Sequence, residues 1–172
     1  MGVDMIVLTG NPGVGVDNKA ITKALADLNE AVGDRVILTA GKMHASGILS
    51  EAGEKILTKE DAETFIEAGA DVLLLPAPGT VPGFTMEHAA ELIKTAHEKG
   101  VLAMTTIGTS QEGADEATIR QIALMCKMAG ADIHHIGDSG YMGMALPENI
   151  TAYSVAIRGK CVWPGNYGDH PK

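Results

Sequence analysis

A lysine and a histidine, Lys42 and His44, stand two residues apart in a segment rich in small residues, 39–47. While the chain is extended, side chains two residues apart project to the same side. A lysine at a strand end can form a Schiff base or hold a phosphate or enolate as a fixed cation, and a nearby histidine can move protons. The pair therefore predicts catalytic residues, with a solvent-reaching lysine and a loop-capping histidine as the alternative.

Glycines and hydroxyl side chains mark three segments as candidate anion sites. Segments 108–110 and 137–140 have the composition of loops that hold a substrate phosphate at strand ends. Segment 10–15 precedes a helix start, so its amides could also cradle an anion, although a tight turn fits equally well and the spacing does not match the dinucleotide fingerprint. The predicted ligand-binding residues are Asn11, Gly13, Gly15, Gly108, Thr109, Ser110, Gly137, Ser139 and Gly140.

Two adjacent histidines, His134 and His135, face opposite sides if their segment is a strand. His134 then shares its side with Asp138, which gives an imidazole–carboxylate pair and adds Asp138 to the predicted catalytic residues. A metal site would need three converging ligands, such as His44, His134 and Asp138, and the other strand ends lack carboxylates. We therefore predict neither a metal site nor a cofactor.

Five aliphatic runs alternate with helical patterns along the chain. Each run follows a glycine, and these glycines recur about every 30 to 36 residues, the size of a βαβ unit. Continuous aliphatic runs joined by helices are typical of a parallel sheet buried on both faces, so the predicted class is α/β. The predicted strands are 5–9, 36–39, 72–75, 102–107 and 133–136, and the predicted helices are 18–32, 60–68, 85–99, 115–129 and 147–158.

Two topologies fit five βα units: an incomplete TIM (β/α)8-type barrel and a five-stranded flavodoxin-like open sheet. The first strand begins almost at Met1, and its lead-in, residues 2–4, repeats a phrase that elsewhere follows a helix. This favours the barrel, as if earlier units were missing upstream. The predicted single domain covers residues 1–160, and segment 161–172 is predicted to be an irregular tail because it is rich in helix and strand breakers.

Composition narrows the partners and the compartment. A net charge of −9, from 13 Lys+Arg and 22 Asp+Glu, would repel nucleic acid and anionic membranes. No apolar run is long enough to span a bilayer and the start has no basic signal region, so we expect a cytoplasmic protein. The two cysteines fit neither a disulfide framework nor a zinc site. The expected partner is a small anionic metabolite.

Residues 4–13, 40–44, 78–85 and 135–141 carry a resemblance to an uncharacterised family of bacterial (β/α)8-barrel proteins. Some members of that family are labelled phosphoenolpyruvate-phosphonomutase-like or haloacid-dehalogenase-like. The resemblance covers residues 2–159 and implies a cytoplasmic barrel protein whose first three units are absent here. It implies no particular activity or catalytic residues.

The haloacid-dehalogenase-like label depends on residues 136–139, which resemble the metal-binding Gly-Asp-Ser step of those phosphatases. Their nucleophile is the first aspartate of an Asp-x-Asp motif, and this chain has no such motif. The phosphonomutase superfamily holds Mg²⁺ with carboxylates at strand ends, where this chain has threonine, glycine and lysine. A haloacid-dehalogenase-like hydrolase is therefore the disfavoured alternative.

The predicted function is that of a TIM-barrel lyase, aldolase or isomerase acting on a small phosphorylated or carboxylated metabolite. Lys42 would be the electrophilic or Schiff-base group, with His44 and Asp138 in proton transfer and the last two loops holding the anion. The alternative is a non-catalytic metabolite-binding protein or structural relic of a truncated barrel. Five strands taken from eight leave two open edges, which predicts a homo-oligomer, most simply a two-fold dimer.

Overall fold

A computed structural model describes residues 2–45, 47–109, 111–137 and 145–160 of the chain. Strands and helices alternate as predicted, and every predicted boundary lies within two residues of the observed one. In the described part of the chain, no helix is long and apolar enough to span a membrane. The strands are β1 (Met5–Thr9), β2 (Ile37–Gly41), β3 (Val72–Pro76), β4 (Leu102–Ile107) and β5 (Ile133–Ile136), and the helices are α1 (Asn18–Val32), α2 (Lys59–Glu67), α3 (Met86–Glu98), α4 (Glu116–Ala129) and α5 (Pro147–Arg158).

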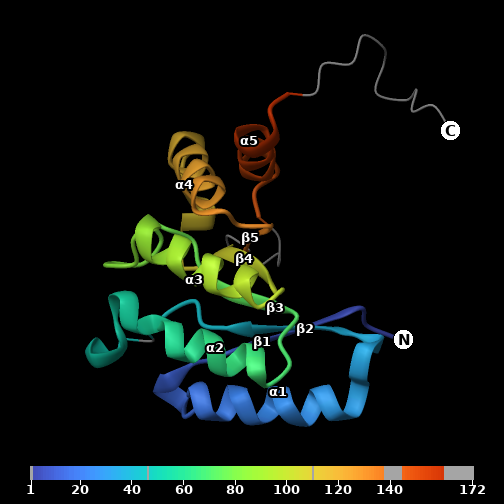
Figure 1. Cartoon of the computed structure of the whole chain (residues 1–172). Coiled ribbons are helices and arrows are strands. Elements are labelled where there is room, and N and C mark those ends of the chain that lie inside the picture. Colours follow the sequence, from blue (N-terminus) through green and yellow to red (C-terminus); the bar gives the residue numbers. More distant parts are fainter. Residues whose placement is uncertain (1, 46, 110, 138–144, 161–172) are drawn as a thin grey trace, which may run out of the picture.

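The five strands form one parallel sheet in the order β1-β2-β3-β4-β5, so each strand lies beside its neighbour in the sequence. The sheet curls, and the helices follow its outer side (Figure 1). A flavodoxin-like sheet instead places its first strand between the second and the third. The sequential order excludes that alternative and confirms the incomplete TIM-type barrel, a half-barrel of five βα units.

Apolar side chains on the outer face of the sheet hold the helices in place. Leu38, Leu73 and Leu75 pack against α1, α2 and α3, while Ile107 and Ile136 pack against α4 and α5. Burial of these side chains supplies most of the stabilisation of the helix layer. The aliphatic runs predicted a sheet buried on both faces, but in the described residues the helices cover only the outer face, because a barrel sheet turns its other face inward.

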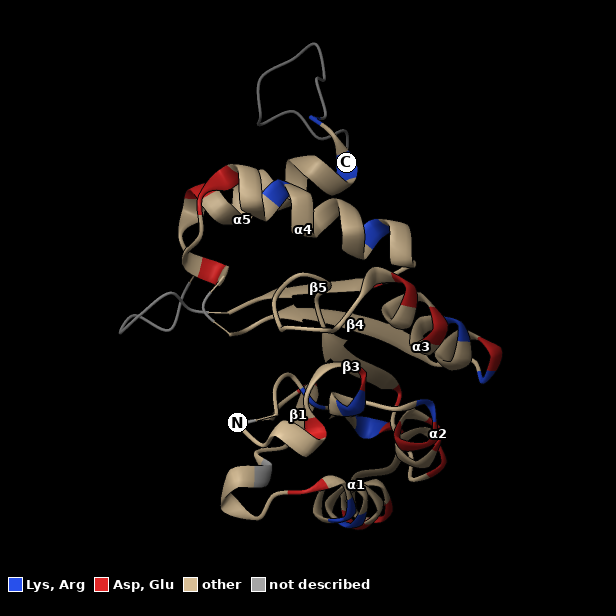
Figure 2. Ribbon diagram, turned by 90° about the vertical axis from the view of Figure 1, so that its left-hand side faces the viewer, with Lys and Arg blue, Asp and Glu red and all other residues tan. Residues whose placement is uncertain are grey.

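The concave face of the sheet carries no charged side chain. None of the five strands contains Asp, Glu, Lys or Arg, and the charged residues lie on the helices and connecting segments (Figure 2). The register places Val7, Thr39, Val72 and Leu102 side by side in one layer. Thr39 and Val72 are buried, whereas Val7, Ile37 and Leu102 are 47%, 44% and 49% exposed.

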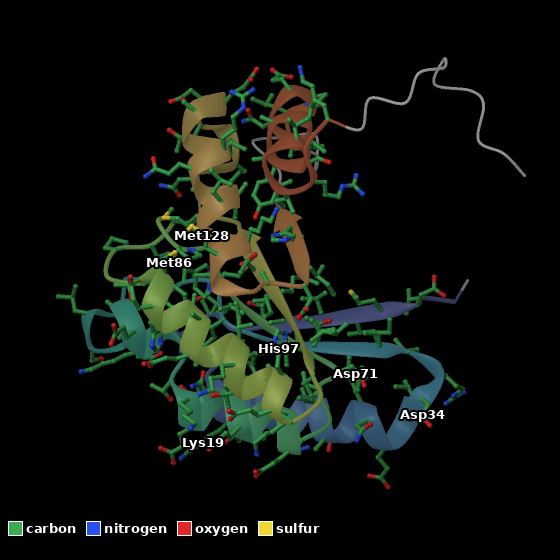
Figure 3. The ribbon with its side chains drawn as sticks, turned by 45° about the horizontal axis from the view of Figure 1, so that its top comes forward. Lys19, Asp34, Asp71, Met86, His97 and Met128 are labelled. Atoms are coloured by element: carbon green, nitrogen blue, oxygen red, sulfur yellow. The ribbon has the colours of Figure 1, made fainter. Side chains whose placement is uncertain are left out.

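The aspartates of two Gly-Ala-Asp segments, residues 69–71 and 130–132, close the amino-terminal end of the half-barrel. Asp71 accepts a hydrogen bond from the backbone N–H of Leu38 in β2, and Asp132 accepts one from that of Ala103 in β4, both at 2.8 Å. His97 adds a contact of 2.8 Å between its Nε2 and a carboxylate oxygen of Asp132; Figure 3 shows Asp71 and His97 at this end. In TIM barrels this end serves stability, and the opposite end carries the active site.

Candidate functional site

Lys42 follows β2 directly, at the carboxyl end of the sheet. Alternation along the strand directs its side chain to the outer side, and only 1% of the residue is exposed. Its Nζ donates a hydrogen bond to Oε2 of Glu51 at 2.7 Å. The Glu51 side chain is 36% exposed and belongs to a short 3₁₀ helix, Leu49–Glu51. Lys42 is therefore a buried cation whose counter-ion lies nearer to solvent.

A cavity of about 210 Å³ lies between this ion pair and the start of α1. Three lysines and two carboxylates line it, so the cavity is locally positive although the chain as a whole carries a net charge of −9. The positive end of the α1 dipole adds to this excess. The lining residues are Asp17, Asn18, Lys19, Lys42, Glu51 and Lys55.

The first turn of α1 offers polar groups to this cavity. Asp17 caps the helix by accepting a hydrogen bond from the N–H of Ala20 at 2.9 Å. The N–H groups of Asn18 and Lys19 have no hydrogen-bond partner among the described residues, and the buried Oδ1 atom of Asn18 also lacks one there. Unpaired amides at a helix start bind phosphate or carboxylate groups. The cavity can therefore hold a small anion.

Two glycines make room for Lys42. A Cβ atom at Gly10 would lie 2.8 Å from the backbone oxygen of Val16 and 3.4 Å from Cγ of Lys42. A Cβ atom at Gly41 would lie 1.8 Å from the carbonyl oxygen of Leu74, far inside van der Waals contact. Larger residues at these positions would displace the first loop or the β2–β3 pairing, and with them the stem of Lys42.

Met43 and His44 continue the chain beyond Lys42. Met43 packs against the concave-face cluster that includes Met104, and its Sδ would lie 3.1 Å from a Cβ atom at Gly108. His44 is half-buried in the same connection. Lys42 and Met43 thus lie on opposite sides of the sheet, and a catalytic partnership of Lys42 with His44 stays a prediction.

The two loops predicted to bind phosphate adjoin each other at Gly108 and Gly137. The N–H of Gly137 donates to the carbonyl of Ile107 at 2.7 Å, and the hydroxyl of Thr109 donates to the carbonyl of Thr80 at 2.9 Å. Both donors are therefore used within the protein, and anion binding here stays a prediction. The other residues predicted for these loops lie outside the described residues: Ser110, Asp138, Ser139 and Gly140.

The glycine-rich first loop is a tight turn. The carbonyl of Asn11 accepts hydrogen bonds from the N–H groups of Val14 and Val16, both at 3.1 Å, and Gly15 has a φ of 84°. Two amides are therefore used by the turn itself, which confirms the turn interpretation. Anion binding by Asn11, Gly13 and Gly15 stays a prediction.

The two histidines of β5 lie on opposite sides of the sheet, as alternation predicts, and His134 is the one that faces the helices. Nδ1 of His134 lies 3.1 Å from the hydroxyl of Tyr153 in α5, while His135 is exposed. The outward Ile136, two residues on, packs with the helices and fixes this orientation. Desolvation lowers the pKa of His134, and burial raises the pKa values of Tyr153 and Cys126. His134 is thus part of a part-buried polar contact with α5, and its predicted partner Asp138 lies outside the described residues.

A second cavity, of about 390 Å³, lies over the proline-rich loop between β3 and α3. Only uncharged residues line it, and the Thr80 hydroxyl donates to the carbonyl of Ala77 at 2.7 Å, so this loop is built mainly by its own contacts, as its sequence predicts. Within the described ranges, no group of three or more His, Cys, Asp or Glu residues is placed to hold a metal ion.

Three charged residues of the smaller cavity belong to none of the sequence motifs: Lys19, Glu51 and Lys55. Asp17 and Asn18 were visible only as helix caps. An acidic residue in the connection after Lys42 is the one signal for Glu51, and the sequence does not choose between it and Glu54.

Residues 1–162 match a family described as a domain of unknown function, DUF7916. The chain belongs to this family. A curated relative from Haemophilus influenzae, named "Putative N-acetylmannosamine-6-phosphate 2-epimerase", is 34% identical over 89 residues, which are 52% of this chain. The match spans only 33% of that relative's length. An uncharacterised, TIM-barrel-like family agrees with the resemblance carried by the sequence phrases.

Solved structures that share the fold include two aldolases. Deoxyribose phosphate aldolase from Aeropyrum pernix has a TM-score of 0.61 and 16% identity, over 90% of this chain and 71% of that chain. An archaeal fructose-1,6-bisphosphate aldolase has a TM-score of 0.59 and 17% identity, over 90% of this chain and 55% of that chain. At these identities the likeness establishes the barrel architecture.

Proposed function

We propose that this protein is a lyase, aldolase or isomerase of TIM-barrel type that acts on a small phosphorylated or carboxylated metabolite. The observation that carries the proposal is Lys42, a lysine that is 1% exposed at the carboxyl end of β2 and borders a locally positive cavity. Reactive groups of parallel α/β barrels collect at this end of the strands.

The chemistry proposed for Lys42 is imine formation. Its neutral amine attacks the carbonyl carbon of the substrate, and the carbinolamine then loses water to leave a protonated imine that can accept an electron pair from a breaking C–C or C–H bond. Glu51, 2.7 Å from Nζ, is placed to take the proton that the ammonium must lose. His44 and Asp138 are proposed to move protons, and Gly108, Thr109 and Gly137 to flank the substrate.

The descriptions of the relatives favour a phosphorylated substrate. The relative from Haemophilus influenzae is named for N-acetylmannosamine-6-phosphate. Of the two aldolases, one is named for deoxyribose phosphate, and the other is described with its catalytic lysine bound to a carbinolamine intermediate. The shared fold and these descriptions support a proposal of the same class of chemistry for this chain.

A second candidate function is metabolite binding without catalysis. Lys42 is paired with a carboxylate at 2.7 Å, which suits a fixed cation as well as a nucleophile.

Borohydride trapping separates these two functions. The protein is incubated with pyruvate or dihydroxyacetone phosphate and sodium borohydride, and adducts are located by peptide mass spectrometry. We expect a reduced adduct on Lys42 that disappears in Lys42→Met and persists in Lys94→Met, a control at an exposed lysine paired with Glu98. Equal labelling of the Lys42→Met protein would refute imine chemistry at Lys42, and binding with no adduct would favour the non-catalytic function.

We also propose that the chain forms a homo-oligomer in the cytoplasm. β1 and β5 each pair with a single strand in the described sheet, and Val7, Ile37 and Leu102 expose apolar surface on its concave face. A two-fold dimer would cover this face and both edges. The buried, unpaired thiol of Cys126 suits a reducing compartment.

A further inference from the structure

We propose that the cavity between α1 and residues 49–56 binds the anionic group of a small metabolite, and that this anion displaces Glu51 from Lys42. The inference deepens the proposed function and rests on it, because it assigns the same lysine a binding partner. The sequence motifs include Lys42 but not the cavity as a whole, since its lining comes from three separate segments.

The fixed part of the site is positive. The Lys42 side chain is 2% exposed and its stem passes close to Gly10, so the ammonium has little freedom to move. Lys19 and Lys55 border the same cavity. The helix start beside them presents amides of Asn18 and Lys19 that lack partners in the described residues. A phosphate or carboxylate entering the cavity would meet a buried cation, a helix dipole and free N–H groups together.

The movable part of the site is Glu51. Its side chain is 36% exposed, against 2% for Lys42, so the carboxylate lies on the solvent side of the ion pair. The 3₁₀ helix that carries it contains no buried residue, and its first residue, Leu49, is 90% exposed. Segments with so few buried contacts open at low free-energy cost. Glu51 can therefore leave while Lys42 stays.

Exchange of Glu51 for a ligand anion explains why the ion pair joins a buried lysine to a more exposed carboxylate. A buried ammonium without a counter-ion is strongly unfavourable, so Lys42 must be paired with an anion whenever it is protonated. Glu51 supplies the negative charge in the empty site, and the incoming anion supplies it in the filled one. The cost of removing Glu51 is thereby offset only by a ligand that brings its own charge, which selects anions over neutral molecules.

Asn18 narrows the ligand class further. It lines the cavity, and its Oδ1 atom is a buried acceptor without a hydrogen-bond partner in the described part of the chain. A ligand hydroxyl would satisfy this acceptor. The site therefore favours a phosphorylated or carboxylated metabolite that also carries a hydroxyl group.

The test uses thermal unfolding with inorganic phosphate as the probe, at constant ionic strength maintained with sodium chloride. Without phosphate, Glu51→Gln should melt below the wild type, because Lys42 then lacks its counter-ion. Phosphate should stabilise Glu51→Gln at an about tenfold lower concentration than the wild type, because no internal carboxylate competes. Lys42→Met should lose the phosphate response, and Lys94→Met should keep it. Glycerol 3-phosphate should stabilise the wild type more than inorganic phosphate does. In Asn18→Ala the two ligands should stabilise the protein equally.

Equal phosphate responses in the wild type, Glu51→Gln and Lys42→Met would overturn the inference, since phosphate would then bind elsewhere. If Glu51→Gln does not fold, Glu51→Asp replaces it, because the shorter carboxylate withdraws from Lys42 and should likewise sharpen the phosphate response. The outcome is independent of imine trapping. A Lys42 adduct with no phosphate effect would sink only this inference, and a phosphate effect with no adduct would sink only the imine chemistry.

Discussion

The position of Lys42 depends on two glycines, Gly10 and Gly41, which have no side chain. Gly41 lies so close to β3 that a Cβ atom would be 1.8 Å from the carbonyl oxygen of Leu74. Such an overlap cannot be relieved by a rotamer change, because the atom it meets belongs to the backbone. The absence of a side chain at Gly41 thus allows both the close pairing of β2 with β3 and the outward path of Lys42.

Gly41→Ala should lower the free energy of unfolding by about 3 kcal/mol, the upper range for overpacking a core. Urea unfolding followed by circular dichroism measures the change. Gly2→Ala is the matched control, because a Cβ atom there meets nothing within 4 Å. A Gly41→Ala protein as stable as the Gly2→Ala protein would contradict the observed strand pairing.

The lowered pKa of His134 predicts how the free energy of unfolding changes with pH. Desolvation lowers its pKa from the ordinary value of 6.5, with the charge of Asp132 opposing the shift. The unfolded chain therefore binds a proton more readily than the folded one below about pH 6.5, and the free energy of unfolding should fall as the pH decreases through that range. Between pH 7.5 and 5.5, the wild type should lose more stability in urea unfolding than His134→Gln. An equal loss in both proteins would mean that His134 carries no such penalty.

Residue type identifies Lys42 as a candidate site residue, but it does not identify Glu51. Lys42 is recognisable because a lysine among small residues at a strand end is unusual. Glu51 is not, because its position depends on a 3₁₀ turn whose residues, Leu49–Glu51, have no periodic pattern. For His134 and His135, alternation fixes only that their sides differ, and tertiary packing of Ile136 decides which one faces the helices.

Helix α2 begins shortly after the 3₁₀ helix Gly53–Ile56, whose Lys55 lines the cavity. Its start is a complete capping box. The hydroxyl of Thr58 accepts the N–H of Asp61 at 3.2 Å, and the carboxylate of Asp61 accepts the N–H of Thr58 at 3.0 Å. The cap fixes where the connection ends and the helix begins.

Thr58→Ala should lower the free energy of unfolding by about 1 kcal/mol, because it removes the hydroxyl that accepts the N–H of Asp61 and donates to the Asp61 carboxylate. Denaturant unfolding measures this value. Thr64→Ala in the same helix is the control, since that side chain is exposed and alanine is a better helix former than threonine. Similar losses in the two variants would show that the capping box does not stabilise α2.

Regular elements were predictable because each carries its own signal. The aliphatic run of β3 and the apolar face of α4, with Ile119, Ile122 and Cys126 buried, can be read from spacing alone. The concave face was not predictable in the same way, since β3 is buried throughout while Val7 and Leu102 are exposed. Exposure there depends on the curvature of the whole sheet, which no single run encodes.

The proposed association of the whole molecule depends on an uncharged concave face and on the two edges of the described sheet. Burying a charge against this face would be unfavourable, so its partner should be equally uncharged. A second copy offers such a face together with complementary edges for β1 and β5. Its interface should exceed about 2,000 Å², the lower range of obligate dimers.

Sedimentation at micromolar concentration should therefore give a dimer. Leu102→Glu should shift the equilibrium toward monomer, because it places a charge within the covered face. Leu124→Glu is the control, since Leu124 is 47% exposed, close to the 49% of Leu102, but lies on α4 outside the sheet. A monomeric wild type, or equal dissociation by both substitutions, would contradict the dimer.

An amide NMR titration with inorganic phosphate tests the proposed anion site at Lys42 and the start of α1. The N–H signals of Asn18 and Lys19 should shift most and saturate together, and these shifts should vanish in Lys42→Met. Shifts concentrated at Gly108, Thr109 and Gly137, or small uniform shifts across the chain, would contradict it.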